Sequence, residues 1–156
     1  MTTSVIPPGL EFVFEIMAEI SDTYTGGEGL FGERLHIPIT GGTVSGPKLN
    51  GKILPGGSDW ALLRRDGNSA VSAHYTIIAD DGTPIYVHNK GLRVSDSEVT
   101  ARLRSGEPVE PNELYFRSSP VFDTPAGVHD WLMNYIFVAT LARKGDYIQI
   151  QVFKLL

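Results

Sequence analysis

A tight bend with two glycines brings an acid and an aromatic ring to one short stretch of the chain. The segment reads Gly56-Gly57-Ser58-Asp59-Trp60. The glycines allow the backbone to turn sharply and to approach a ligand closely. Asp59 could then act as a general acid or base whose pKa is raised by an apolar cavity, with Trp60 as a stacking wall. The alternative is a turn aspartate that bonds local amides and a tryptophan that fills the core.

A histidine on an alternating segment is the second candidate for moving protons. His74 lies on the polar face of the segment 70–79, and Tyr75 lies on its apolar face. Because the polar face of a meander barrel is usually the wet outside, His74 would then meet solvent or a second subunit. In a ligand barrel, a polar inner face can instead line the cavity. His74 would then be the natural proton carrier near neutral pH.

The next alternating segment, 83–93, carries further candidates. Tyr86 lies on one face of it and Asn89 on the other. A hairpin turn predicted at 80–82 places this segment beside the one that holds Tyr75, so the tyrosines and histidines of the two segments should face one another. Tyr75, Tyr86 and Asn89 are therefore candidate substrate-binding residues. The alternative is that tyrosine–histidine neighbours across strands are pure packing.

Polar and aromatic residues beyond the predicted helix form a third group. Tyr115 and Arg117 precede the Ser118-Ser119-Pro120 break. Arg117 could clamp a carboxylate or enolate through two parallel hydrogen bonds, or it could simply bridge loop carbonyls. Asn134 could offer its amide to a polar ligand atom near the end of the barrel, where Trp131 is expected to be a core residue.

What the chain lacks excludes several kinds of chemistry. It has no cysteine, so disulfides, thiolate metal sites and cysteine nucleophiles are excluded. Its four histidines have no metal-ligand spacing, and no Gly-x-Ser-x-Gly occurs. The glycine-rich segment 26–29 lacks the Lys-Ser/Thr pair of a phosphate-binding loop. We therefore expect neither a metal nor a cofactor.

Charge and hydropathy bear on the location of the protein and on its binding partners. The net charge of −5 repels phosphate backbones, and no basic stripe offsets it. No apolar run approaches the roughly 20 residues that a membrane span needs. The first residues lack the basic start and apolar middle of a secretory signal. We expect a soluble cytoplasmic protein that binds neither nucleic acid nor membranes.

Short apolar segments, separated by many of the 17 glycines and 10 prolines, predict a chain of strands. The segment 10–20 is the clearest strand, because apolar residues alternate there with glutamates and other residues of a wet face. A glycine-rich loop is expected at 26–29, and Gly41-Gly42 should close the second strand. One helix is expected over 95–106, capped by Ser95. The other expected elements are strands at 33–40, 49–54, 60–65, 70–79, 83–93, 135–142 and 147–155, extended pieces at 114–117 and 121–123, and a helical turn at 130–134.

These elements predict one mainly β domain over 1–156, with 1–8 as a loose N-terminal tail. A flat sheet of eight to ten strands would leave two long edges exposed, so closure or a sandwich is expected. We predict a closed antiparallel barrel of about eight strands in meander order, with one short helix. The interior of such a barrel holds side chains or one small ligand.

Four segments together are similar to a known family. They are Ile37-Pro38-Ile39-Thr40-Gly41-Gly42, then Gly46-Pro47 with Leu49 and Gly51, then Gly56-Gly57-Ser58-Asp59-Trp60, and Tyr115-Phe116-Arg117 before Pro120. Their order and spacing resemble an uncharacterised microbial family of small proteins, grouped by structure with the allene-oxide-cyclase-like β-barrels. The resemblance implies an eight-stranded barrel, often dimeric, with a cavity at one mouth, and it implies no settled activity. The chain departs from the family at Ser72-Ala73-His74-Tyr75, where many relatives carry an acidic residue and an arginine before the tyrosine.

The leading functional hypothesis is a barrel that binds a small apolar or aromatic oxygenated molecule. If it is an enzyme, we expect cofactor-free acid–base chemistry: isomerisation, cyclisation, hydration or elimination. Asp59 or His74 would move the proton. The substrate-binding candidates are Trp60, Tyr75, Tyr86, Asn89, Tyr115, Arg117 and Asn134. The alternatives are a non-catalytic carrier and a structural homodimer whose barrel is full of side chains.

Overall fold

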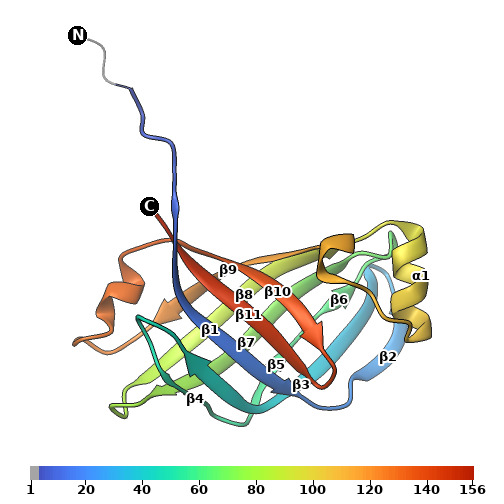
Figure 1. Cartoon of the computed structure of the whole chain (residues 1–156). Coiled ribbons are helices and arrows are strands. Elements are labelled where there is room, and N and C mark those ends of the chain that lie inside the picture. Colours follow the sequence, from blue (N-terminus) through green and yellow to red (C-terminus); the bar gives the residue numbers. More distant parts are fainter. Residues whose placement is uncertain (1–3) are drawn as a thin grey trace.

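Alternating apolar and polar residues form long strands whose apolar faces meet in the core. The strands wrap around one another in a single barrel (Figure 1). The structure is a computed structural model that describes residues 4–156. Its elements are β1 Leu10–Ile20, β2 Tyr24–Gly29, β3 Gly32–Ser45, β4 Gly51–Ile53, β5 Gly57–Asp59, β6 Leu62–Leu63, β7 Ser69–Ala79, β8 Pro84–Val94, α1 Ser97–Ser105, η1 Pro111–Glu113, β9 Tyr115–Asp123, η2 Asp130–Met133, β10 Phe137–Lys144 and β11 Tyr147–Leu155.

The sheet closes on itself because β1 pairs with β11 on one edge and with β3 on the other. The three short strands β4, β5 and β6 succeed one another between β3 and β7, so they share one position in the ring. β2 forms a hairpin with β3 outside the ring. The result is a closed antiparallel barrel of eight strands with a single short helix, as the sequence predicts.

The longest strand, β3, corrects two expectations. Gly41-Gly42 does not end the strand, which continues to Ser45 and pairs there with β1. At Gly42 the backbone has φ 137°, and a Cβ would collide with the carbonyl oxygen of Met17, so glycine lets the two strands approach. The glycine-rich segment 26–29 is also not a loop, because it belongs to β2 and pairs with the first half of β3.

Other boundaries differ where segments are short. The strand expected at 60–65 is reduced to β6, two residues long, and the one expected at 49–54 to β4. The pieces expected on either side of Pro120 form one strand, β9, in which Pro120 lies opposite Asn89. Pairing with complete neighbouring strands, rather than local propensity, therefore sets these bounds.

Apolar side chains fill the barrel toward one end, which η2 covers (Figure 1). Leu132 of η2 is buried, and Trp131 packs edge-on against Phe137, with ring centroids 5.7 Å apart. Phe137 in turn packs against Phe122, which meets Phe14. We call this the η2 end. The opposite end, where β7 begins and β8 ends beside α1, is the helix end.

The N-cap of helix α1 lies one residue later than the sequence suggests. Asp96, not Ser95, is the N-cap, and its carboxylate accepts a hydrogen bond of 2.9 Å from the Val99 amide. The Ser95 hydroxyl instead meets the Thr100 hydroxyl at 2.8 Å. Gly106 ends the helix in the left-handed conformation, with φ 79°.

Replacing Asp96 by alanine is expected to lower the free energy of unfolding by about 1 kcal/mol, because the Val99 amide loses its acceptor. Urea unfolding followed by circular dichroism measures the change. Ser97→Ala, at an exposed position next to the cap, is the matched control and should stay within about 0.5 kcal/mol of wild type. Equal losses in both variants would contradict the assignment of the cap.

The remaining features concern the N-terminus and membranes. Residues 4–9 have no regular secondary structure and extend away from the barrel (Figure 1), and residues 1–3 of the expected tail lie outside the described part of the chain. Across residues 4–156, no helix has the length and apolar character needed to cross a bilayer.

Candidate functional site

The inner face of the barrel becomes polar toward the helix end. Six polar side chains lie there, at inward-facing positions of four neighbouring strands. We call them the interior polar cluster: Asp59 of β5, Ser69 and Tyr75 of β7, Asn89 and Arg93 of β8, and Ser118 of β9.

Strand register brings these residues together. Asp59 lies opposite Ala73, which itself lies opposite Asn89 on β8. Two inward-facing positions further toward the helix end, Ser69 lies opposite Arg93. Because directly opposed residues of an antiparallel pair share a face, all of them point into the barrel. Gly57 allows this arrangement, since a Cβ there would meet the backbone of β7.

Asp59 is a partly buried carboxyl whose pKa is raised. Its Oδ1 accepts a hydrogen bond of 2.9 Å from the Ser72 amide. Burial raises the pKa of Asp59, while the Ser72 amide and the Arg93 charge act in the opposite direction. This hydrogen bond to a local amide matches the alternative role considered for Asp59, that of an aspartate that stabilises a turn. It engages one carboxylate oxygen and leaves the group able to exchange a proton.

Arg93 brings a positive charge close to Asp59. Its Nη2 donates a hydrogen bond of 3.1 Å to the Ser69 hydroxyl. Burial and the neighbouring Arg143 lower the pKa of Arg93, and Asp59 opposes that effect. Two guanidinium groups at one end of the barrel favour an anion or an electron-rich oxygen there.

Three members of the cluster have buried polar atoms that find no hydrogen-bond partner among the described residues: Tyr75 Oη, Asn89 Oδ1 and Ser118 Oγ. Asn89 is only 2% exposed. Burial strongly raises the pKa of Tyr75, so its hydroxyl stays a neutral donor. Buried polar atoms in folded proteins normally have partners, so these three atoms are positioned for water or for a ligand.

Apolar side chains share the helix end of the barrel with the cluster. Ile20, Phe116 and Ile148 are partly buried and pack against the core, and Phe116 lies opposite Arg93. An apolar wall with a few convergent polar groups is the composition typical of small-molecule sites.

Three of the predicted site residues therefore lie on the same inner face at nearby register positions, namely Asp59, Tyr75 and Asn89. His74 and Tyr86 do not join them, because they lie on the outer face of the barrel. His74 Nδ1 contacts the Tyr86 hydroxyl, and its ring stacks on His88 with centroids 3.9 Å apart. The facing of tyrosines and histidines across β7 and β8 is confirmed by the register, in which His74 lies opposite His88.

The expectation that Asp59 and Trp60 share one hollow is wrong. Neighbouring residues of an extended segment point to opposite faces, so Asp59 faces the interior while Trp60 is 48% exposed outside. The Trp60 ring stacks on His36, with centroids 4.2 Å apart. Trp60 is therefore not the core residue of the alternative interpretation either.

The last three predicted residues lie at the surface. Arg117 donates a hydrogen bond of 2.9 Å to the Phe116 carbonyl and lies 5.6 Å from the ring centre of Tyr115, which is itself exposed. The side chain of Asn134 is exposed, and its backbone amide donates to the Trp131 carbonyl at 3.0 Å. Binding roles for Tyr115, Arg117 and Asn134 stay predictions.

Ser69, Arg93 and Ser118 are cluster members that the sequence reasoning missed. A signal for two of them existed. Arg93 is in phase with Asn89 two strand repeats earlier, and Ser69 is in phase with Tyr75. Every second residue of a strand faces the core. Extending the inward-facing positions of each strand to its end therefore identifies both residues.

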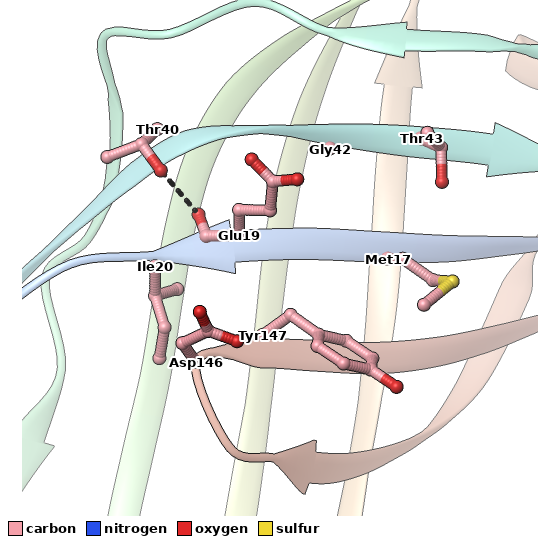
Figure 2. A pocket seen from close by; sticks show the side chains of 8 residues that line it. All are labelled: Met17, Glu19, Ile20, Thr40, Gly42, Thr43, Asp146 and Tyr147. Atoms are coloured by element: carbon pink, nitrogen blue, oxygen red, sulfur yellow. Dashed lines mark hydrogen bonds between the residues drawn. The ribbon is translucent and has the colours of Figure 1, made fainter.

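Two hollows on the outer surface are distinct from the interior polar cluster. One, of about 410 Å³, lies over β1, β3 and the turn between β10 and β11. Figure 2 shows its lining, where Met17 and Glu19 lie beside Tyr147. At its edge the Thr40 hydroxyl donates a hydrogen bond of 3.4 Å to the Glu19 carbonyl (Figure 2). The other, of about 600 Å³, lies beside Trp60. In the part of the chain from residue 4 onward, no three histidine or acidic side chains are grouped as metal ligands.

Asp59 should make stability depend on pH in the opposite direction to most aspartates. Its pKa is raised above 3.8 in the folded state. This contribution to the free energy of unfolding is fully present below the unfolded pKa and is lost as pH rises through the folded pKa. Asp59→Asn stays neutral, so its stability relative to wild type should increase as pH rises from about 3.5 to 7. Urea unfolding across that range measures the difference, and a decrease with rising pH would contradict the raised pKa.

The fold and this site define a class: a closed antiparallel barrel with polar groups inside one end. Residues 8–155 match the family described as "Protein of unknown function (DUF3237)", and the chain belongs to this family. The family resemblance found in the sequence is thereby confirmed.

Relatives and solved structures agree with this assignment. A UPF0311 protein of Rhodopseudomonas palustris is 40% identical over 151 residues, covering 96% of this chain and 99% of the relative. The crystal structure of a conserved protein of unknown function from the same organism has a TM-score of 0.91 at 38% identity, covering 97% of this chain and 100% of that one. A structure from Clostridium acetobutylicum has a TM-score of 0.90 at 37% identity, covering 98% and 100%.

A more distant relative has a named activity. The "Hydroalkoxylation enzyme phnH" of Penicillium herquei is 31% identical over 81 residues, which are 52% of this chain and 54% of the relative. The structure of an enzyme from Penicillium herquei has a TM-score of 0.74 at 21% identity and covers 100% of both chains, which shows a common fold.

Proposed function

We propose that the interior polar cluster is the active site of a cofactor-independent acid–base enzyme of the isomerase, cyclase or lyase kind. The observation that carries the proposal is the partly buried Asp59 carboxyl with a raised pKa, which interacts with the Arg93 charge and shares the inner face with unpartnered polar atoms. Perturbed carboxyls that combine burial with a specific charged partner are frequent at catalytic sites.

Each group has a role in such chemistry. Asp59 gives and takes the proton, because a carboxyl with a raised pKa keeps that proton closer to neutral pH. Arg93 and the neutral Tyr75 hydroxyl stabilise negative charge that develops on a substrate oxygen. Asn89 Oδ1 accepts a hydrogen bond from a substrate hydroxyl. Phe116 and its apolar neighbours hold the hydrocarbon part.

The named activity of the distant relative belongs to this class of chemistry. Hydroalkoxylation adds the O–H of an alcohol across a carbon–carbon double bond. In one concerted step, the Asp59 carboxylic acid would give its proton to one alkene carbon while the alcohol oxygen bonds to the other carbon and passes its own proton to the second carboxyl oxygen. The departing proton leaves negative charge on the alcohol oxygen, and Arg93 and Tyr75 would stabilise that charge. When both groups lie in one molecule, the product is a cyclic isomer. The balance requires neither an oxidant nor a reductant.

A simple alkenyl phenol tests the proposal. The protein is incubated with 2-(3-methylbut-2-enyl)phenol, and chromatography with mass detection follows the cyclic ether, which has the same mass and a different retention time. We expect the ether to form faster than with heat-denatured protein. Unchanged substrate that binds and co-elutes with the protein would favour a carrier instead. Native mass spectrometry of the same preparation measures the number of subunits. The expected homodimer stays a prediction.

A further inference from the structure

The groove beside Trp60 is an aromatic-lined hollow on the outer face of the barrel. Its volume of about 600 Å³ falls within the range of small-molecule sites, roughly 300–1,000 Å³. It lies between the β2–β3 hairpin and the bend that precedes β5. The residues that matter for its chemistry are Tyr24, His36, Pro38, Pro55, Ser58 and Trp60.

Three aromatic rings form a stack along this groove. Tyr24 lies opposite His36 in the β2–β3 ladder, with ring centroids 5.6 Å apart. His36 in turn stacks on Trp60 at 4.2 Å, with an interplanar angle of 24°. Tyr24 is nevertheless 65% exposed, and nearly half of Trp60 is exposed. Mutual stacking fixes the rings while leaving much of their surface to solvent, which is the arrangement of a preformed binding platform.

Ser58 supplies the polar group of the groove. The residue is 4% exposed, and its hydroxyl has no hydrogen-bond partner among the described residues although it lines the hollow. Ser58 lies opposite Pro38 on β3, and proline has no amide to offer it. A buried hydroxyl without a partner loses hydrogen-bond energy unless water or a ligand completes it.

We propose that this groove binds a planar aromatic molecule that carries a hydroxyl or carbonyl oxygen. The ring of the ligand packs against the exposed surfaces of Trp60 and Tyr24, and its oxygen pairs with the Ser58 hydroxyl. Ser58 and Trp60 face outward, whereas Asp59 between them faces the interior. The groove is therefore a second site on the opposite side of the barrel wall, and it does not depend on the proposed catalytic function.

Nuclear magnetic resonance of the two indole N–H groups tests the proposal. The chain has two tryptophans, Trp60 and Trp131, and Trp60→Phe assigns their signals by removing one of them. Titration of 15N-labelled protein with 1-naphthol should shift the Trp60 signal to saturation and leave the Trp131 signal in place. Naphthalene, which lacks the oxygen, should bind about fivefold more weakly, as expected for one lost hydrogen bond.

Two variants complete the test. Ser58→Ala should weaken 1-naphthol binding about fivefold and abolish its advantage over naphthalene. Asp59→Asn should bind like wild type, because its side chain lies on the other face. A Trp60 signal that does not move, or Ser58→Ala binding that equals wild type, would overturn the proposal. A shift caused by a peptide of residues 4–10, without one caused by 1-naphthol, would overturn it as well and would assign the groove to an exposed chain segment.

Discussion

Asp59→Asn is expected to reduce turnover of the alkenyl phenol by about 10²–10⁴-fold. Asparagine keeps an oxygen that can accept the Ser72 amide hydrogen bond, so the bend before β6 should persist. It cannot exchange a proton, so acid–base catalysis should be lost. The melting temperature should be unchanged or slightly raised at neutral pH, because the variant no longer keeps an ionisable group buried. Product formation and thermal unfolding are measured on the same preparation.

The matched control is His74→Gln, which changes the other proton-transfer candidate from the sequence. His74 lies on the outer face, so its replacement should leave turnover within about twofold of wild type. The reverse pattern, with activity lost in His74→Gln and kept in Asp59→Asn, would move the chemistry to the outer face. A large fall in the melting temperature of Asp59→Asn would instead identify Asp59 as a structural residue.

The long strands could be predicted from the sequence because period-two alternation is strong over many residues. The observed β1 and β11 have the expected bounds, β7 begins one residue earlier than expected, and β8 is shifted by one residue at both ends. The short strands could not be predicted in this way. β4, β5 and β6 together contribute only a few residues, and they exist because β3 and β7 each offer an unpaired edge to them. The position of these short strands therefore depends on the pairing of distant segments and not on their own residues.

The site was harder to predict than the fold, because residue type and residue direction were not combined. Trp60 and His74 have side chains suited to binding or proton transfer, yet both lie outside. Arg93 lies in no conspicuous motif, although it is in phase with Asn89, which is fully buried. In this barrel the outer face carries aromatic and imidazole rings, so the polar or aromatic character of one residue does not tell which face is inside. The face on which the apolar residues of a strand alternate does identify the inside.

The second strong effect should come from removing a single oxygen inside the barrel. Tyr75→Phe deletes a hydroxyl that is fully buried and has no partner among the described residues. Removing such a group relieves its desolvation cost, so the free energy of unfolding should rise by up to about 1–3 kcal/mol. If the same hydroxyl donates to a developing oxyanion, turnover should fall about tenfold or more.

Stability and activity should therefore change in opposite directions in Tyr75→Phe, which a purely structural tyrosine would not produce. Urea unfolding and the isomer assay measure the two quantities. Tyr86→Phe makes the same chemical change on the outer face of the neighbouring strand, so it should alter turnover by less than about twofold. If Tyr75→Phe lost stability and activity in parallel, the Tyr75 hydroxyl would stabilise the fold, through a hydrogen bond to a bound water. If it kept full activity, the oxyanion would have to be held by Arg93 without Tyr75, because Arg93 is the positively charged donor of the cluster.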